Sequence, residues 1–303
     1  LGFDAFGVAA AGPPDPEGRL EDWLARGYHG GLDWIERAVD RRLDLDLNLP
    51  GARSVIALAV AYDRGEPRAE GPVRVARYAR GRDYHSWVRK RVRKLRKRLL
   101  ELDPGCRAYP TVDTSPVLER AWAARAGVAW IGKSTMAIHP RLGTYTFLAT
   151  VVTDSLLVPG DTIADHCGSC TACLDACPTS AFPEPGVLDA RRCISHWTLE
   201  VPGELPAEAP PFHGWVAGCD VCQEVCPWNK FARSAPPDSP AHPRPELSAP
   251  SAEVFADPGL SSALEQVLDG TALRRTGARA IRRNARRVRG PPPEPEPPAD
   301  QDE

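Results

Sequence analysis

Eight of the nine cysteines in this chain lie between positions 167 and 226, and no other feature restricts the fold as strongly. The first run reads C-x2-C-x2-C-x3-C-P and consists of Cys167, Cys170, Cys173 and Cys177. The second run reads C-x2-C-x3-C-P and consists of Cys219, Cys222 and Cys226, with Cys193 between the two runs. Disulfide frameworks occur mainly in small secreted scaffolds, whereas clustering in a chain of 303 residues indicates metal ligation in a reducing compartment.

The first run has the spacing of bacterial ferredoxin motifs, in which three thiolates bind one [4Fe–4S] cluster and the fourth binds a second cluster. Applied to both runs, this crossover rule assigns the first cluster to Cys167, Cys170, Cys173 and Cys226. It assigns the second cluster to Cys177, Cys193, Cys219 and Cys222. Structural zinc is the alternative, but its ligands usually form two separated C-x2-C pairs, and the repeated proline-terminated run favours the clusters. Cys106 stands apart and is expected to be a small buried side chain.

Ahead of the cysteines, helical and strand-like patterns alternate. Two short helices are expected within 16–41, a long amphipathic helix over Tyr84–Leu102, and a further helix from Ser115-Pro116 to Gly127. Buried strands are expected at 54–62, 107–112, 135–138 and 144–152. This order predicts a layered α+β domain.

The composition changes near residue 160 and again after Trp228, which predicts four regions. These are an α+β domain at 1–158, a ferredoxin-like segment at 159–232, a short arginine-rich helical region at 233–290 and a disordered tail at 291–303. Weak helices are expected around 261–268 and 278–288 within the third region.

One sequence motif matches a nucleotide-binding pattern, but its usual function is not expected here. Residues 127–134 match G-x4-G-K-[ST], the phosphate-binding loop of many nucleotide hydrolases. That loop needs a strand before it and a helix after it, so that backbone N–H groups face the phosphates. Here a helix precedes the motif and an extended segment follows. We therefore expect no nucleotide hydrolysis and a different anionic ligand.

The net charge of −2 conceals two basic segments. Eight of ten residues are basic between Arg89 and Arg98, and eight of sixteen are arginine between Arg274 and Arg289. Such stripes favour a polyanionic partner, although a charged helix is more commonly a solvated face. No apolar run is long enough to span a membrane, and the start of the chain has no export-signal pattern, so we expect a cytoplasmic protein with no membrane partner.

Five motifs occur in a fixed order: Asp113-Thr-Ser-Pro-Val-Leu-Glu-Arg120, Trp130-Ile-Gly-Lys133, the first cysteine run, Cys193-Ile-Ser195 and the second cysteine run. Together they resemble the epoxyqueuosine reductases, from about Gly2 to Trp228. The resemblance implies a nitroreductase-like, reductive-dehalogenase-like cobalamin-binding domain followed by a bacterial ferredoxin-like domain. It implies reduction of epoxyqueuosine to queuosine at the wobble position of tRNA, the last step of queuosine biosynthesis, with electrons passing from two [4Fe–4S] clusters to cobalamin.

The resemblance also implies site residues. Asp113 matches the family's proton donor, and to donate at neutral pH its pKa must rise above about 3.9; the alternative is a turn-forming role. The positions that match cobalamin-binding segments are Arg42, Ala76, Lys133, Ser134, Ala137, Leu148, Ser195 and Thr198. For Arg42, a solvated charge at a helix end is the alternative.

The partners implied are the anticodon stem-loop of tRNA and a low-potential electron donor, acting with a monomeric enzyme. The helix at 89–98 is a candidate for phosphate contacts, since these dominate nucleic-acid affinity. The segment Arg282-Arg283-Asn284-Ala285 resembles a remaining piece of the helical-repeat tail of some relatives. Two other functions stay open: a corrinoid reductive dehalogenase, and a cobalamin-free polyferredoxin that only relays electrons.

Overall fold

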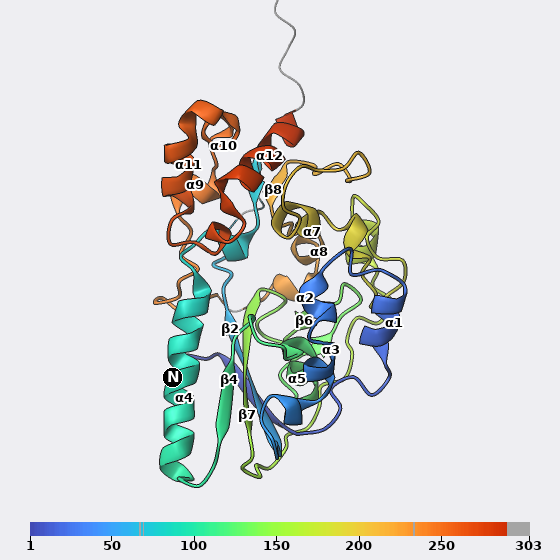
Figure 1. Ribbon diagram of the computed structural model, residues 1–303, viewed down its shortest axis with the longest axis vertical. Coiled ribbons are helices and arrows are strands. Elements are labelled where there is room, and N and C mark those ends of the chain that lie inside the picture. Colours follow the sequence, from blue (N-terminus) through green and yellow to red (C-terminus); the bar gives the residue numbers. More distant parts are fainter. Residues whose placement is uncertain (67, 69, 233, 290–303) are drawn as a thin grey trace, which may run out of the picture.

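A four-stranded antiparallel sheet forms the centre of the computed structural model, which describes residues 1–66, 68, 70–232 and 234–289 (Figure 1). The expected disordered tail at 291–303 lies outside the described residues. The strand order is β1-β2-β7-β4, and the strands are β1 (Ala5–Ala10), β2 (Ser54–Ala61), β7 (Thr146–Thr153) and β4 (Ala108–Thr111). The three pairings are antiparallel.

Strand β2 is buried along its whole length because helices cover both faces of the sheet. Side chains alternate between the faces of a strand. Ile56, Leu58 and Val60 pack with the apolar stripe of α4 (Tyr84–Leu102). The intervening positions pack around Trp122 of α5 (Glu119–Arg125) on the other face. The layered arrangement and the bounds of the long helix are therefore as predicted.

Helix α5 begins at Glu119, so the predicted start at Ser115-Pro116 was wrong. Two tight turns occupy the intervening residues, with the Thr114 amide donating to the Val112 carbonyl and the Val117 amide donating to the Ser115 carbonyl. Ser115 therefore caps no helix. The N-terminal strand β1 was also missed, and three short helices replace the predicted pair: α1 (Arg19–Ala25), α2 (Asp33–Glu36) and α3 (Val39–Leu43).

The phosphate-loop-like motif folds into a hairpin of β5 (Trp130–Ile131) and β6 (Ala137–Ile138). Helix α5 precedes it and no helix follows it within the described part of the chain up to β7. The arrangement needed for a phosphate-binding loop is therefore missing from the described structure, as the sequence predicted.

The cysteine-rich segment contains the short helices α6 (Ala172–Asp175), α7 (Ile194–Leu199) and α8 (Val221–Glu224). It also contains a strand that the sequence did not predict, β8 (Trp215–Ala217), which pairs in parallel with β3 (Arg74–Val75). This pairing joins the cysteine-rich segment to the first half of the chain.

Four helices follow: α9 (Pro245–Ser248), α10 (Ala252–Ala256), α11 (Ser261–Leu268) and α12 (Gly277–Arg289). They bury Leu247, Phe255, Leu264 and Ile281 against β3 and β8, and form the orange and red end of the molecule in Figure 1. The two weak helices predicted near 261–268 and 278–288 are confirmed. None of the helices in the described part of the chain is both long enough and apolar enough to cross a bilayer.

Candidate active site and cluster-binding segment

Asp113 lies just after β4 with its backbone at φ 56°. This left-handed conformation is uncommon for a residue other than glycine, and such strain is often found at functional sites. The Asp113 side chain is 59% exposed, so it is accessible from outside. The alternative role as a turn former does not account for the contacts of its side chain.

Two neighbouring side chains of α4 hold the Asp113 carboxylate. The Tyr84 hydroxyl donates to Oδ2 at 2.9 Å, and Nε2 of His85 lies 2.8 Å from the same oxygen. On the other side of the ring, Nδ1 of His85 lies 2.6 Å from Oδ1 of Asp83. Asp83 also caps the N-terminus of α4 by accepting from the His85 amide at 3.0 Å, which fixes its position. The result is an Asp83–His85–Asp113 chain.

Burial pushes the pKa of Asp113 upward, but the hydrogen bonds from His85 and Tyr84 outweigh it and leave the pKa below its ordinary value. The expected rise in the pKa of Asp113 is therefore wrong for this structure. Burial acts to lower the pKa of His85, and its hydrogen bonds to Asp113 and Asp83 raise it overall. The proton of the pair thus resides on His85.

Sequence reasoning missed His85 and Tyr84 as site residues. The signal for His85 is its position directly after the Asp83 cap, whereas Tyr84 belongs to the apolar face of α4 and packs with Val88 and Val92. Burial raises the pKa of Tyr84, as does the adjacent Asp113 charge, so Tyr84 remains a hydrogen-bond donor. Its ring stacks on Phe147 with centroids 4.0 Å apart, which fixes its orientation.

A second acidic group lies behind Asp113. Burial raises the pKa of Glu119 to about 7, with a further contribution from the Asp113 charge and opposition from Arg42. Arg42 is only 8% exposed and lies over the Trp34 ring at 5.0 Å, so it is not a solvated charge. Among the described residues, Nε of Arg42 and Oε1 of Glu119 are buried without a hydrogen-bond partner.

The other predicted cofactor positions lie in several places. Ala76 and Thr198 are buried beside β8, and the Thr198 hydroxyl accepts from the Gly218 amide at 3.0 Å. Ser195 is half-buried on α7, near the same strand. Ala137 lies in β6, and Leu148 lies in β7 on the α5 side of the sheet. Lys133 and Ser134 instead face the first cysteine run.

The eight clustered cysteines form two groups in space. Burial raises the pKa of the Cys226 thiol, and its thiol neighbours are Cys173, Cys167 and Cys170 of the first run. Burial likewise raises the pKa of Cys222, whose thiol neighbours are Cys219, Cys193 and Cys177. The structure thus brings together the same two sets that the crossover rule assigned. The short helices α6 and α8 pack against each other and carry parts of both runs.

No group of three ligating side chains within the described ranges is close enough to hold a single metal ion. A structural zinc ion requires four ligands converging on one point. A cubane is larger, because each thiolate binds a different iron atom. The described cysteines form no disulfide, and Cys106 is buried apart from the others, as predicted.

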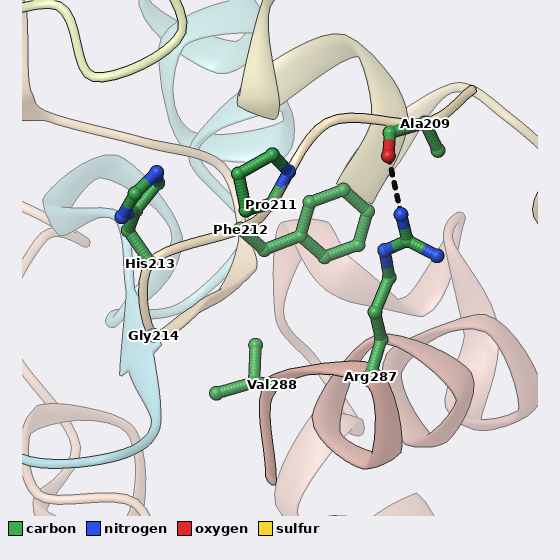
Figure 2. Close-up of a pocket in the computed structure, with 7 residues that line it drawn as sticks. All are labelled: Ala209, Pro211, Phe212, His213, Gly214, Arg287 and Val288. Carbon is green, nitrogen blue, oxygen red and sulfur yellow. Dashed lines mark hydrogen bonds between the residues drawn. The ribbon is translucent and has the colours of Figure 1, made fainter. Parts of the chain in front are cut away.

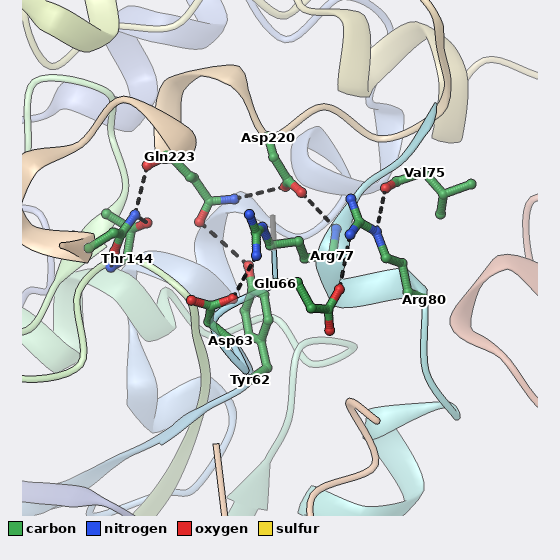
Figure 3. Close-up of polar contacts among 10 residues, drawn as sticks. Tyr62, Asp63, Glu66, Val75, Arg77, Arg80, Thr144, Asp220 and Gln223 are labelled. Atoms are coloured by element: carbon green, nitrogen blue, oxygen red, sulfur yellow. Dashed lines mark hydrogen bonds and ion pairs between the residues drawn. The ribbon is translucent and has the colours of Figure 1, made fainter. Parts of the chain in front are cut away.

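A buried polar network joins the second cysteine run to the sheet (Figure 3). Asp220 accepts from the Arg77 amide at 2.7 Å, and Arg77 pairs with Asp63 at 2.8 Å. Gln223 donates to Asp220 at 3.3 Å and accepts from the Tyr62 hydroxyl at 3.4 Å. Burial raises the pKa of Asp220 to about 6. The network fixes the second run relative to β2 and β3.

The arginine-rich helix α12 is bound largely to the protein itself. Arg283 donates to the carbonyls of Val201 and Trp197, and Arg286 donates to that of Ala256. Asn284 is fully buried and donates to the carbonyls of Thr198 and Val216. These contacts attach α12 to α7 and β8, so much of this basic segment has a structural role.

A hollow of about 540 Å³ lies beside α12 (Figure 2). Its lining includes Phe212, His213 and Arg287, with the Arg287 guanidinium 5.4 Å from the Phe212 ring. Arg287 also donates to the Ala209 carbonyl, as the dashed line in Figure 2 indicates. No predicted site residue lines this hollow.

A layered α+β domain with a hydrogen-bonded acid, joined to a segment built around two sets of thiols, defines an iron–sulfur oxidoreductase. Two family models match the chain: the 4Fe-4S double cluster binding domain over residues 166–229, and epoxyqueuosine reductase QueG, DUF1730, over residues 42–114. The epoxyqueuosine reductase of Gloeobacter violaceus is 42% identical over 303 residues, covering 96% of this chain and 92% of that protein. The chain therefore belongs to the epoxyqueuosine reductase family.

Solved structures agree with this assignment. An epoxyqueuosine reductase with a tRNA-Tyr epoxyqueuosine-modified stem loop matches with a TM-score of 0.83 and 32% identity, covering 94% of this chain and 76% of that one. The Bacillus subtilis epoxyqueuosine reductase, with its aspartate catalytic loop swung out of the active site, matches with a TM-score of 0.81 and 31% identity over the same shares.

Proposed function

We propose that this enzyme reduces epoxyqueuosine to queuosine at the wobble position of tRNA, the last step of queuosine biosynthesis. The observation that carries the proposal is the match over 94% of this chain to an epoxyqueuosine reductase with a modified tRNA stem loop. Opening the epoxide to an alkene consumes two electrons and two protons and releases the oxygen as water. The protein must therefore supply single electrons and a proton donor next to the bound nucleotide.

The electrons pass through two [4Fe–4S] clusters. The first is held by Cys167, Cys170, Cys173 and Cys226, and the second by Cys177, Cys193, Cys219 and Cys222. The grouping of the thiols supports these sets. They lie in a ferredoxin-like domain at 159–232, between a nitroreductase-like, reductive-dehalogenase-like domain at 1–158 and the helical region at 233–290.

Cobalamin is the cofactor of the first domain, and when bound it supplies the strongly reducing metal centre. The residues present fit such a group, because buried Arg42 and Glu119 each have an unpartnered polar atom for its amide side chains. We assign cofactor contacts to Ala76, Ser195 and Thr198 near β8, and to Ala137 and Leu148 near α5. Lys133 and Ser134 lie next to the first cysteine run.

His85 carries the proton of the pair, and Asp113 takes that proton through the 2.8 Å contact and passes it to the departing epoxide oxygen. Asp83 stabilises the charged His85 ring before the transfer. The exposure of Asp113 and its strained backbone support this role. In the Bacillus subtilis relative, an aspartate lies on a catalytic loop that swings, which agrees with an accessible acid.

The anticodon stem-loop of tRNA is the macromolecular partner, and a low-potential donor supplies the electrons. Lys90, Arg93 and Lys94 are exposed on α4, the helix that begins at the Asp113 site, so they follow the backbone of the bound RNA. Replacing all three by alanine is expected to weaken stem-loop binding and to flatten its salt dependence. The enzyme acts as a monomer in the cytoplasm, where its tRNA substrate is found.

The test is mass spectrometry of tRNA nucleosides after incubation with anaerobically prepared, reduced, cobalamin-loaded protein. Conversion of epoxyqueuosine to queuosine is the expected result. Failure to take up a corrinoid would favour an electron relay. Dehalogenation of small aromatic halides without any change in epoxyqueuosine would favour the dehalogenase.

A further inference from the structure

Lys133 contacts the first cysteine run directly. Its Nζ donates to the carbonyl of Gly168 at 2.7 Å and to the carbonyl of Cys170 at 3.0 Å. Both carbonyls belong to the loop between Cys167 and Cys170. The half-buried ammonium group therefore joins the two ends of this loop and places a positive charge beside it.

The residues on either side of Lys133 contact the same run. Ser134 is 5% exposed, and its hydroxyl faces the Cys173 thiol. Gly132 lies so close that a Cβ there would be 3.4 Å from Sγ of Cys167 and 2.4 Å from Cδ1 of Ile138. Residues 132–134 thus approach three of the four cysteines proposed for the first cluster.

The β5–β6 hairpin sets this geometry. The Gly132 amide donates to the Met136 carbonyl, and the Thr135 amide donates to the Gly132 carbonyl, each at 2.9 Å. Thr135 has φ 61°, which closes the turn. Arg120 of α5 donates to the Thr135 carbonyl at 2.7 Å, which fixes the hairpin against the helix after Asp113. The segment that resembles a phosphate-binding loop is a support for the cysteine loop.

We propose that Lys133 and Ser134 are positioning residues for the first iron–sulfur cluster, and that they raise its reduction potential relative to that of the second. Reduction adds one negative charge to a cluster, so a nearby ammonium group and a hydroxyl donor to sulfur stabilise the reduced form. Asp165, which accepts from the Cys167 amide at 2.7 Å, acts in the opposite direction. This inference rests on the proposed ligand set of the first cluster and not on the substrate.

The test is an EPR-monitored redox titration of the anaerobic protein with both clusters, in the wild type and in four variants. Lys133→Met removes the charge and keeps the chain length, whereas Lys133→Arg keeps the charge. Ser134→Ala removes the hydroxyl. Arg279→Met removes an exposed charge on α12 and is the control. No substrate is needed, so the result does not depend on epoxyqueuosine turnover.

In Lys133→Met and Ser134→Ala, one cluster is expected to become harder to reduce, by about tenfold in its reduction equilibrium, with the other cluster unchanged. Lys133→Arg and Arg279→Met are expected to titrate like the wild type. If Lys133→Met loses one cluster entirely while Lys133→Arg keeps both, the positioning role is supported and Ser134→Ala tests the potential. Unchanged potentials in both Lys133→Met and Ser134→Ala, or equal shifts of both clusters, would overturn the inference.

Discussion

Replacing Asp113 by asparagine tests its proposed role as proton donor, because the two side chains have nearly the same shape. The amide oxygen still accepts from Tyr84, but the side chain no longer carries an exchangeable acidic proton. A positioned general acid typically contributes about 10²–10⁴-fold in rate, so we expect the single-turnover rate to fall by that factor, or about 2.7–5.4 kcal/mol in barrier height. Because the side chain is 59% exposed, stability is expected to change by less than about 0.5 kcal/mol.

The assay follows conversion of an epoxyqueuosine-containing stem-loop under single-turnover conditions, with nucleosides quantified by mass spectrometry. Iron content, corrinoid absorption and stem-loop affinity are measured in parallel and are expected to match the wild type. Asp83→Asn is the control, because it perturbs the far side of His85 and leaves Asp113 in place; a fall of about tenfold or less is expected. A rate within threefold of the wild type for Asp113→Asn would refute the role of this acid.

Three further predictions follow from the described contacts. The hydrogen bonds to Asp113 and Asp83 raise the pKa of His85, so we expect turnover to be constant at low pH and to fall as pH rises through that pKa. Asp83→Asn is expected to move this fall to lower pH. The charges of other groups that face Asp113 also contribute to the profile, namely Tyr78, Glu119, Arg120 and Arg275. Asn284→Ala removes the donor to two buried carbonyls, so it is expected to lower the free energy of unfolding by about 2–4 kcal/mol in thermal or denaturant melts. The control Arg279→Ala, at an exposed position of α12, is expected to change it by less than about 0.5 kcal/mol. Cys226→Ser and Cys173→Ser are expected to lose the same cluster and leave identical EPR spectra, whereas a match between Cys226→Ser and Cys222→Ser would contradict crossed ligation.

Much of the central domain could be predicted because its signals are local. The apolar run of β2 and the apolar stripe of α4 each predict which residues are buried. Strand β1 could not be recognised in this way, since it pairs with β2 on one side only and is mostly half-buried. Strands β3 and β8 are two and three residues long, and their pairing joins segments about 140 positions apart, so no local pattern indicates it.

Some residues of the candidate site could likewise be predicted from the sequence, and others could not. The cysteine sets could be predicted because cluster spacing is fixed by a short loop, and Asp113 could be named only from the family resemblance. The Asp83–His85–Asp113 chain depends on how α4 packs beside the end of β4. The hydrophobic periodicity of α4 does not predict this tertiary contact. The charge run of α12 does not reveal whether its groups face solvent or backbone carbonyls, and the structure shows Arg283 and Arg286 donating to carbonyls.

The central claim is that two distant cysteine runs together hold two [4Fe–4S] clusters that supply electrons to the Asp113 site. Iron and acid-labile sulfide analysis of anaerobically purified protein, combined with a zinc determination, tests it most directly. We expect about eight iron atoms and eight sulfide ions per chain, and almost no bound zinc. About four of each, or stoichiometric zinc in their place, would contradict it.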